Sequence, residues 1–335
     1  MTDRDRAVYV IAEAGMNHDG SVGNARRMAD VATECGADGV KYQTHISPAE
    51  TLKDAPMPPY FKGEPRYEYF DRTAFSEAQW SELKAYCDEI GIGFLSSPFS
   101  VEAVELLERV GIDQYKIPSG EVTNISYLTE IARTGKPVLL SSGMSSWQEL
   151  DAAVEAVKAH HDRLTVLQCT SDYPCEYVNV GLNVMLAIRD RYDTPVGLSD
   201  HTLTNYASFA AATLGASVIE RHFTLSQYLY GSDARHSLEP PQLADLVTGI
   251  RAITTMLSTD VDKDAIEKFS VMKDTFEKSV VSVADIPVGT TIARDHLGIK
   301  KPGTGIPAVR IDDVIGRVTV RDIPVDVLIR EDDLQ

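Results

Sequence analysis

The sequence predicts a (β/α)8 barrel followed by a small β-rich domain, and three observations lead to this fold class. Eight short β-rich runs alternate with helical patterns along most of the chain. After Phe276, Pro and Gly interrupt the strand-like pieces and no long amphipathic helix follows. The length of 335 residues suits one large α/β domain with a small appendage. We therefore expect a barrel over 1–258, a linker over 259–278 and a β-rich domain over 279–335; an open doubly wound sheet is the alternative for the first part.

The eight predicted strands are separated by segments with helix start and stop signals. The strands are expected at residues 8–14, 39–44, 92–97, 114–119, 137–142, 164–169, 195–200 and 217–223. Ser76 with Gln79, and Ser146 with Glu149, predict helix starts in which the two side chains satisfy free backbone amides. Glycines that predict left-handed helix ends follow several of these segments: Gly36, Gly91, Gly111, Gly135 and Gly215.

Charge and cysteine content argue against several classes of protein. The 32 basic and 50 acidic side chains give a formal net charge of -18, which repels nucleic acid and anionic membranes. Four cysteines without a CxxC pair suit buried or idle thiols in a reducing compartment. The first apolar run is too short for a secretory segment, and the stretch 206–219 is shorter than the roughly 20 residues that a bilayer requires. We expect a cytoplasmic protein that binds neither nucleic acid nor membrane.

Polar side chains gather at the predicted carboxyl ends of the strands, where active sites of such barrels lie. Lys41 and Lys116 stand in otherwise apolar strands, and a buried ammonium group must meet an anion. That anion is either an internal carboxylate, such as Glu13 or Glu121, or a small substrate that carries a phosphate and a carboxylate. In the second case the lysines form a positive, donor-rich cup with four hydroxyl groups, those of Ser97, Ser119, Ser141 and Ser199.

Two histidines occupy the ends of neighbouring predicted strands. His201 and His222 are 21 positions apart, about one strand and helix, which places both imidazoles on one face. With Glu13, Asp200 and Glu220 nearby, they favour a divalent metal with open coordination positions. The alternative is a pair of hydrogen-bonded core histidines. Three further histidines fall in predicted loops, where they are either solvated or in contact with substrate: His18, His45 and His236.

Seven motifs resemble, in order and spacing, those of the bacterial sialic acid (N-acetylneuraminate) synthase family. They are IAEAGMNHDGSVGNARRMADVATECGADGVKYQTH, SSPFS, YKIPSGE, LSSGM, CTSDYP, GLSDHT and IERHFT. The later IKKPGTGI resembles the antifreeze-like (SAF) domain of the same family, so the resemblance covers essentially the whole chain. It implies an enzyme that condenses phosphoenolpyruvate with the open-chain aldehyde of an N-acylated hexosamine. The products would be phosphate and a nine-carbon 2-keto acid of the sialic, legionaminic or pseudaminic type.

The resemblance also implies roles for individual residues. His201 and His222 would bind the divalent metal, with manganese expected and magnesium or cobalt as alternatives. Phosphoenolpyruvate would contact Lys41, Ser97, Lys116, Ser119, Ser141, Ser171 and Ser199. The sugar would contact Gln43, Glu121, Tyr173, Asp233 and Lys301. Glu13 would lie close to the metal and its water, and either Glu13 or Glu121 would accept the proton of the attacking water. Asp200 is expected to orient Ser199 or His201 from behind.

Two positions depart from the family pattern. Ser171 stands where sialic acid synthases commonly have Asn, a change compatible with relatives that make legionaminic or pseudaminic acid. Lys301 stands where an Arg of the partner subunit's antifreeze-like domain would reach the N-acyl group, and Lys offers a point charge instead of a planar fork. The acceptor sugar is therefore expected to differ from N-acetylmannosamine. The same resemblance implies a domain-swapped homodimer.

Three other functions stay open on the sequence. The first is a metal-independent aldolase that forms a Schiff base with Lys41 or Lys116. The second is a barrel that binds an acidic sugar without catalysis, although the intact set of lysines and histidines argues against it. The third is the same condensation on another aldose, including a sugar phosphate, in a secondary-metabolite or polysaccharide pathway.

Overall fold

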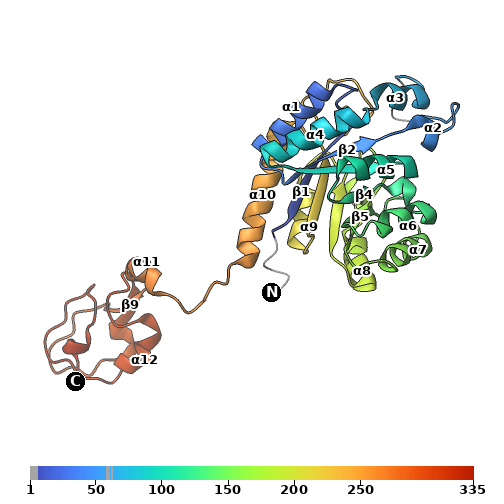
Figure 1. Ribbon diagram of the computed structural model, residues 1–335. Coiled ribbons are helices and arrows are strands. Elements are labelled where there is room, and N and C mark those ends of the chain that lie inside the picture. The colour runs from blue at the N-terminus through green and yellow to red at the C-terminus, as the bar shows by residue number, and fades with distance from the viewer. Residues whose placement is uncertain (1–6, 58–60, 62) are drawn as a thin grey trace. The chain divides into compact units, whose positions relative to one another are not determined.

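The computed structural model describes residues 7–57, 61 and 63–335, and within them the first part of the chain forms a closed barrel of parallel strands (Figure 1). The strands are β1 (Tyr9–Gly15), β2 (Gly39–Thr44), β3 (Gly93–Pro98), β4 (Tyr115–Ile117), β5 (Val138–Ser141), β6 (Leu164–Cys169), β7 (Val196–Asp200) and β8 (Val218–His222). Each pairs with the next, and β8 pairs with β1. The predicted (β/α)8 barrel is therefore confirmed, and the alternative of an open doubly wound sheet is wrong. The charged start of the chain, residues 1–6, lies outside the described residues.

Helices cover the outside of the barrel (Figure 1). They are α1 (Val22–Glu34), α4 (Glu77–Ile90), α5 (Val101–Val110), α6 (Ile125–Arg133), α7 (Trp147–Lys158), α8 (Leu182–Tyr192), α9 (Tyr206–Thr213) and α10 (Pro240–Ser258), with α2 (Ser47–Glu50) and α3 (Arg66–Thr73) between β2 and β3. The capping boxes at Ser76 and Ser146 are confirmed. All five predicted helix-end glycines have positive φ. Among the described residues, no helix combines the length and apolar character needed to cross a membrane.

The side chains inside the barrel change from apolar to polar within two residues along each of five strands. A buried apolar layer is formed by Ile11, Leu95, Leu139, Leu167 and Val218. Alternate residues of a strand point to the same side, so the residue two positions later lies one layer closer to the carboxyl end. In chain order these next residues are Glu13, Ser97, Ser141, Cys169 and Glu220. The apolar layer closes the floor of the barrel, and the polar layer above it forms the base of the mouth.

The chain divides into two compact units, residues 1–259 and 260–335. The second unit contains α11 (Ser270–Phe276), α12 (Ile311–Val314) and an antiparallel pair of strands, β9 (Ser279–Ser282) and β10 (Leu297–Lys300). Its own apolar core consists of Val280, Ile286, Ile292, Leu297, Ile306, Val314, Ile323, Ile329 and Leu334. A separate core of this kind confirms the predicted small β-rich unit.

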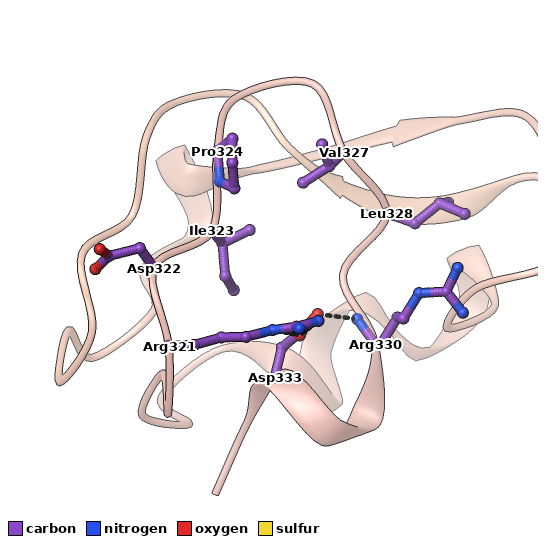
Figure 2. A pocket seen from close by; sticks show the side chains of 8 residues that line it. All are labelled: Arg321, Asp322, Ile323, Pro324, Val327, Leu328, Arg330 and Asp333. Atoms are coloured by element: carbon purple, nitrogen blue, oxygen red, sulfur yellow. Dashed lines mark hydrogen bonds and ion pairs between the residues drawn. The ribbon is translucent and has the colours of Figure 1, made fainter.

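A hollow on the second unit lies between apolar and charged side chains (Figure 2). Ile323, Pro324 and Val327 line one part of it. Asp333 lines the other part, where its buried carboxylate accepts hydrogen bonds from the guanidinium of Arg321 and from the backbone amide of Arg330. The buried charge in this hollow is therefore compensated within the unit.

Candidate active site

Four charged side chains fill the polar layer of the barrel interior. Lys41 Nζ lies 2.7 Å from Glu13 Oε2 and 3.6 Å from Glu220 Oε2. Lys116 Nζ lies 3.3 Å from Glu220 Oε1. All four side chains are buried, although they come from four different strands, β1, β2, β4 and β8. We call them the charged quartet. Glu220 is its central member because it contacts both lysines.

The charges of the quartet balance, which corrects the expectation of a positive cup. Burial lowers the pKa of Lys116, and the nearby Glu220 opposes this only in part. Burial also acts to lower the pKa of Lys41, but Glu13 and Glu220 outweigh it and the pKa is raised. Burial raises the pKa of Glu13 against the influence of Lys41. For Glu220, the two lysines outweigh burial and hold the pKa well below its usual range. Of the two carboxylates predicted from the sequence to pair with a buried lysine, Glu13 does so, with Lys41, and Glu121 does not.

Hydroxyl groups border the quartet on two sides. Lys41 Nζ donates a hydrogen bond to Ser97 Oγ at 3.2 Å. Ser199 Oγ donates to Glu220 Oε1 at 2.8 Å. Ser97 and Ser199 thus lie where the sequence places them, next to the charged groups. Each hydroxyl keeps further hydrogen-bonding capacity for a ligand.

Ser119 follows β4, the strand of Lys116, and Ser141 ends the next strand, β5. Ser141 Oγ is buried and has no hydrogen-bond partner in the part of the chain that the structure describes, which leaves it ready for a ligand oxygen. Ser119 Oγ lies 3.6 Å from Cys169 Sγ and close to Gly143, where an added Cβ would come within 2.0 Å of it. Ser171, which follows β6, is half-buried.

The two histidines at the ends of β7 and β8 face each other, with ring centroids 5.4 Å apart. His201 Nδ1 donates to the carbonyl oxygen of Thr170 at 2.8 Å, and since a carbonyl only accepts, the lone pair of the ring lies on Nε2. Burial lowers the pKa of His201 to about 3, which keeps the ring neutral. His222 Nδ1 is buried without a hydrogen-bond partner among the described residues and lies 4.0 Å from Asp233 Oδ2.

This histidine pair fits a divalent metal. A neutral imidazole with a free lone pair and a buried, unpartnered ring nitrogen are the donors that such an ion requires. Glu13 is the cross-strand neighbour of His222, which brings a carboxylate to the same place. Within the described ranges, no group of three His, Cys, Asp or Glu converges for metal binding. The remaining coordination positions would therefore be filled by oxygen atoms of water or substrate.

Three residues predicted to face the sugar are brought to the mouth of the barrel. Gln43 Nε2 donates to Glu13 Oε1 at 2.8 Å. Asp233 Oδ2 accepts from the backbone amide of Met16 at 3.3 Å, and a Cβ on Gly15 would lie 2.6 Å from this oxygen. Gly15 therefore keeps room for the Asp233 carboxylate. The ring of Tyr173 packs against that of His201, with centroids 4.2 Å apart.

The two other predicted sugar contacts are Glu121 of the first unit and Lys301 of the second. Glu121 lies after β4 in a short 3-10 turn, is half-buried, and accepts a hydrogen bond from Asn124 Nδ2 at 3.3 Å. Burial raises the pKa of Glu121. Lys301 belongs to the second unit, is exposed, and places Nζ 4.9 Å from the ring centroid of Phe276.

Two of the loop histidines, His18 and His45, are buried, so they are not solvated, and contact with substrate stays a prediction. His45 lies between two phenylalanine rings, and its Nε2 is 3.2 Å from Gln43 Oε1. The two-residue alternation of Lys41, Gln43 and His45 was the sequence signal for this inward position. His18 Nδ1 accepts from the amide of Gly20 at 3.1 Å. Burial lowers the pKa of His18 to about 3.

Comparisons with known proteins show the family of the chain. The model of the NeuB family matches residues 28–262, and that of the SAF domain matches residues 277–335. The chain belongs to the NeuB family. An N,N'-diacetyllegionaminic acid synthase of Campylobacter jejuni is 35% identical over 334 residues, with 97% of this chain and 100% of the relative covered. A human N-acetylneuraminate-9-phosphate synthase is 34% identical over 331 residues, covering 97% and 92%.

A solved structure supports the same assignment. An N-acetylneuraminic acid synthetase from Leptospira borgpetersenii, in complex with citrate, aligns with a TM-score of 0.69 at 31% identity. The alignment covers 79% of this chain and 90% of that chain. This NeuB-family protein is thus an enzyme of the synthase type, with a (β/α)8 barrel and a SAF domain.

Proposed function

We propose that this NeuB-family enzyme condenses phosphoenolpyruvate with the open-chain aldehyde of an N-acylated hexosamine, giving a nine-carbon 2-keto acid and phosphate. The observation that carries this proposal is one mouth in which two buried lysines and several hydroxyls lie beneath a pair of facing imidazoles. The names of the relatives, synthases of legionaminic, sialic and pseudaminic acids, support the product class.

The quartet suits a substrate with two anionic ends. Lys116 is buried with only a shared counter-charge, since Glu220 also contacts Lys41. An arriving carboxylate or phosphate would give Lys116 a counter-charge that it does not share, and the free hydroxyl of Ser141 would donate to it. The carboxylates of the quartet hold both ammonium groups at fixed positions before substrate enters. In this proposal, C3 of phosphoenolpyruvate would lie above the quartet, toward the imidazole pair.

The proposed reaction has three steps: carbon–carbon bond formation, addition of water and release of phosphate. C3 of phosphoenolpyruvate attacks the aldehyde carbon, positive charge develops at C2, and water adds there. Collapse of the tetrahedral centre breaks the C–O bond and releases phosphate. Burial raises the pKa of both candidate bases, Glu13 and Glu121, so the choice rests on position. We assign the proton of the attacking water to Glu13, because it neighbours His222 across the strands. Gln43 fixes the Glu13 carboxylate through Oε1.

A divalent metal has a defined place in this proposal. His201 and His222 would hold it, and when bound it supplies Lewis acidity for the aldehyde oxygen. The hydrogen bond of His201 to Thr170 orients that ring before any ligand binds. Manganese is the expected ion, with magnesium or cobalt as alternatives.

Phosphate release tests the proposed function directly. Purified enzyme is incubated with phosphoenolpyruvate, manganese and a panel of N-acylated hexosamines, hexosamine 6-phosphates and neutral aldoses, and phosphate and the 2-keto acid are measured. We expect release only with an N-acylated hexosamine, and its loss in excess EDTA. Lys116→Met should abolish release, whereas Lys136→Met, which removes a surface ion pair with Glu108, should match wild type.

Each other result of this assay points to a different function. Phosphate release with a neutral aldose or a hexosamine 6-phosphate would mean that the acceptor is that class of sugar and not an N-acylated hexosamine. Full activity in EDTA together with trapping by borohydride would indicate the Schiff-base aldolase. No release with any sugar, while an acidic sugar still binds, would indicate a binding protein and contradict the proposal.

A further inference from the structure

A buried ion pair lies directly behind the two histidines, on the outward face of the barrel wall. Arg221 Nη1 is 2.9 Å from Asp200 Oδ2, and the two residues are 1% and 3% exposed. They are cross-strand partners on β7 and β8. Because neighbouring residues of a strand point to opposite sides, Arg221 faces outward where Glu220 and His222 face the barrel interior. No role was predicted for Arg221 from the sequence.

The guanidinium also binds the loop that begins with His201. Arg221 Nη2 donates to the carbonyl oxygen of Thr202 at 2.6 Å, and Nη1 donates to that of Thr204 at 2.6 Å. Asp200 completes the contact from the other side, because its Oδ1 accepts from the amide of Thr202 at 2.8 Å. The Asp200 carboxylate also accepts from Ser208 Oγ of α9 at 2.6 Å. One arginine thus joins β8, β7 and residues 201–205.

This connection links the two imidazoles mechanically. Arg221 directly precedes His222 on β8, and the carbonyls it binds, of Thr202 and Thr204, lie one and three positions after His201. On its other side, His201 is held through its ring by Thr170 and through its carbonyl oxygen by the amide of Cys175 at 3.0 Å. Among these contacts, those of the guanidinium join the loop after His201 directly to β8, whereas the bond from the Thr202 amide to Asp200 joins it to β7.

We propose that Arg221 is a positioning residue that sets the spacing of His201 and His222 and thereby the affinity of the site for a divalent cation. The inference rests on the metal site of the proposed function. A buried ion pair that serves stability alone can be replaced by apolar residues at little cost. The bonds from Arg221 to two separate carbonyls cannot be replaced in this way, because neither Met nor Lys presents two donors in a planar fork.

Binding of Mn²⁺ to the substrate-free enzyme, followed by the electron paramagnetic resonance signal of the free ion, tests this role. Arg221→Met should weaken Mn²⁺ binding by about 10- to 100-fold, the usual effect of losing a group that orients metal ligands. Arg221→Lys should restore the charge but not the affinity. Saturating Mn²⁺ should recover most of kcat in both variants, since the catalytic groups are unchanged.

A double variant separates positioning from folding. Asp200→Leu with Arg221→Met removes both buried charges and leaves neither unpaired, so it should fold with a higher Tm than Arg221→Met and still bind Mn²⁺ weakly. The matched control is Arg251→Met, which removes an Arg–Asp pair with Asp38 beside the first residues of β2. It should lower Tm without changing Mn²⁺ affinity.

The measurement has outcomes that overturn the inference. If Arg221→Met binds Mn²⁺ with wild-type affinity, the ion pair serves stability alone. If Arg221→Met does not fold, the same result in the double variant leads to the same conclusion. A wild-type enzyme that binds no Mn²⁺ would remove both the metal site and this role for Arg221. Phosphate release by the same metal-free sample would then show that the condensation itself still stands.

Discussion

At the scale of single residues, the two buried lysines show what a sequence can reveal about a site and what it cannot. Lys41 and Lys116 are conspicuous because each interrupts an apolar strand, and burial of an ammonium group requires an anion. The identity of that anion depends on which side chains meet across the barrel. Glu220 contacts both lysines only because β8 and β4 face each other inside a closed barrel. The sequence predicts the charges, and strand register decides their partners.

His18 is a second residue whose environment the sequence did not reveal. Its burial should have a measurable effect on the free energy of unfolding. The folded state holds the pKa of this ring at about 3, mainly through burial, whereas an unfolded histidine titrates near 6.5. Between these values the unfolded state binds more protons, so the stability contributed by neutral His18 is present at higher pH and is lost as pH falls. At about pH 5 the loss amounts to about 2 kcal/mol.

Replacement of His18 should remove this pH dependence. In His18→Asn the amide oxygen keeps an acceptor for Gly20, and the side chain does not titrate. We expect the difference in free energy of unfolding between wild type and variant to shrink by about 2 kcal/mol from about pH 8 to about pH 5. Urea unfolding followed by tryptophan fluorescence reports on the barrel, since Trp80 and Trp147 both lie in it. A constant difference across this range would contradict the assigned protonation.

At the scale of elements, the strand–helix alternation and the helix ends were predictable because they depend on local sequence. The capping boxes and positive-φ glycines follow from side-chain chemistry within a few residues. Close approaches between loops were not predictable in this way. Gly143, in the loop after β5, has a φ of 43° and leaves room for Ser119 of the preceding strand–helix connection. The motif LSSGM carries this glycine, but only the fold shows what it makes room for.

Gly143→Ala should therefore impair substrate binding as well as stability. The added Cβ would lie 2.0 Å from both Cβ and Oγ of Ser119, so the whole residue must shift and its hydroxyl must leave its place. We expect KM for phosphoenolpyruvate to rise at least about 10-fold, the effect of losing about 1.4 kcal/mol of binding, with a smaller change in KM for the sugar. Steady-state kinetics measures both constants.

Gly135→Ala is the matched control for this substitution. Gly135 also has a positive φ, of 69°, but nothing lies within 4 Å of an added Cβ. It should lose about 1 kcal/mol of stability through backbone strain and keep both KM values. Equal kinetic effects in the two variants would mean that backbone strain, and not contact with Ser119, is responsible.

At the scale of the whole molecule, the change of pattern after Phe276 was enough to predict a separate second unit, because a segment without long amphipathic helices cannot continue the barrel. All four cysteines are free, as expected from their number and spacing, and the cytoplasmic location stays a prediction.

The assembly of subunits could not be predicted from local sequence patterns, because it depends on surfaces that these patterns do not describe. Large apolar side chains are exposed on the segments after β5, β6, β7 and β8, including the start of α9: Met144, Tyr177, Val178, Leu203, Tyr206 and Tyr228.

We propose that this apolar rim is covered by the SAF domain of a partner subunit, so that each site of a homodimer uses both chains. A rim of this kind is typical of a surface that meets another protein. Covering it would exclude water from the reacting aldehyde and bring Lys301 of the partner subunit to the sugar. Phosphoenolpyruvate, which would lie deeper at the quartet, should be less affected by loss of the SAF domain than the sugar.

Mixing two inactive chains tests the shared site. A chain that ends at residue 276 keeps the barrel but lacks the SAF domain, and a full-length His201→Ala chain keeps the SAF domain but lacks one imidazole of its own site. If they are refolded together, the intact barrel of the first chain can be covered by the SAF domain of the second, and we expect about one active site per heterodimer. Phosphate release by the mixture, with each chain inactive alone, is the expected result. Two results would contradict the shared site. One is a mixture that contains heterodimers by sedimentation but is inactive, and the other is a native enzyme that is active as a monomer. In neither case does a second chain contribute to the site.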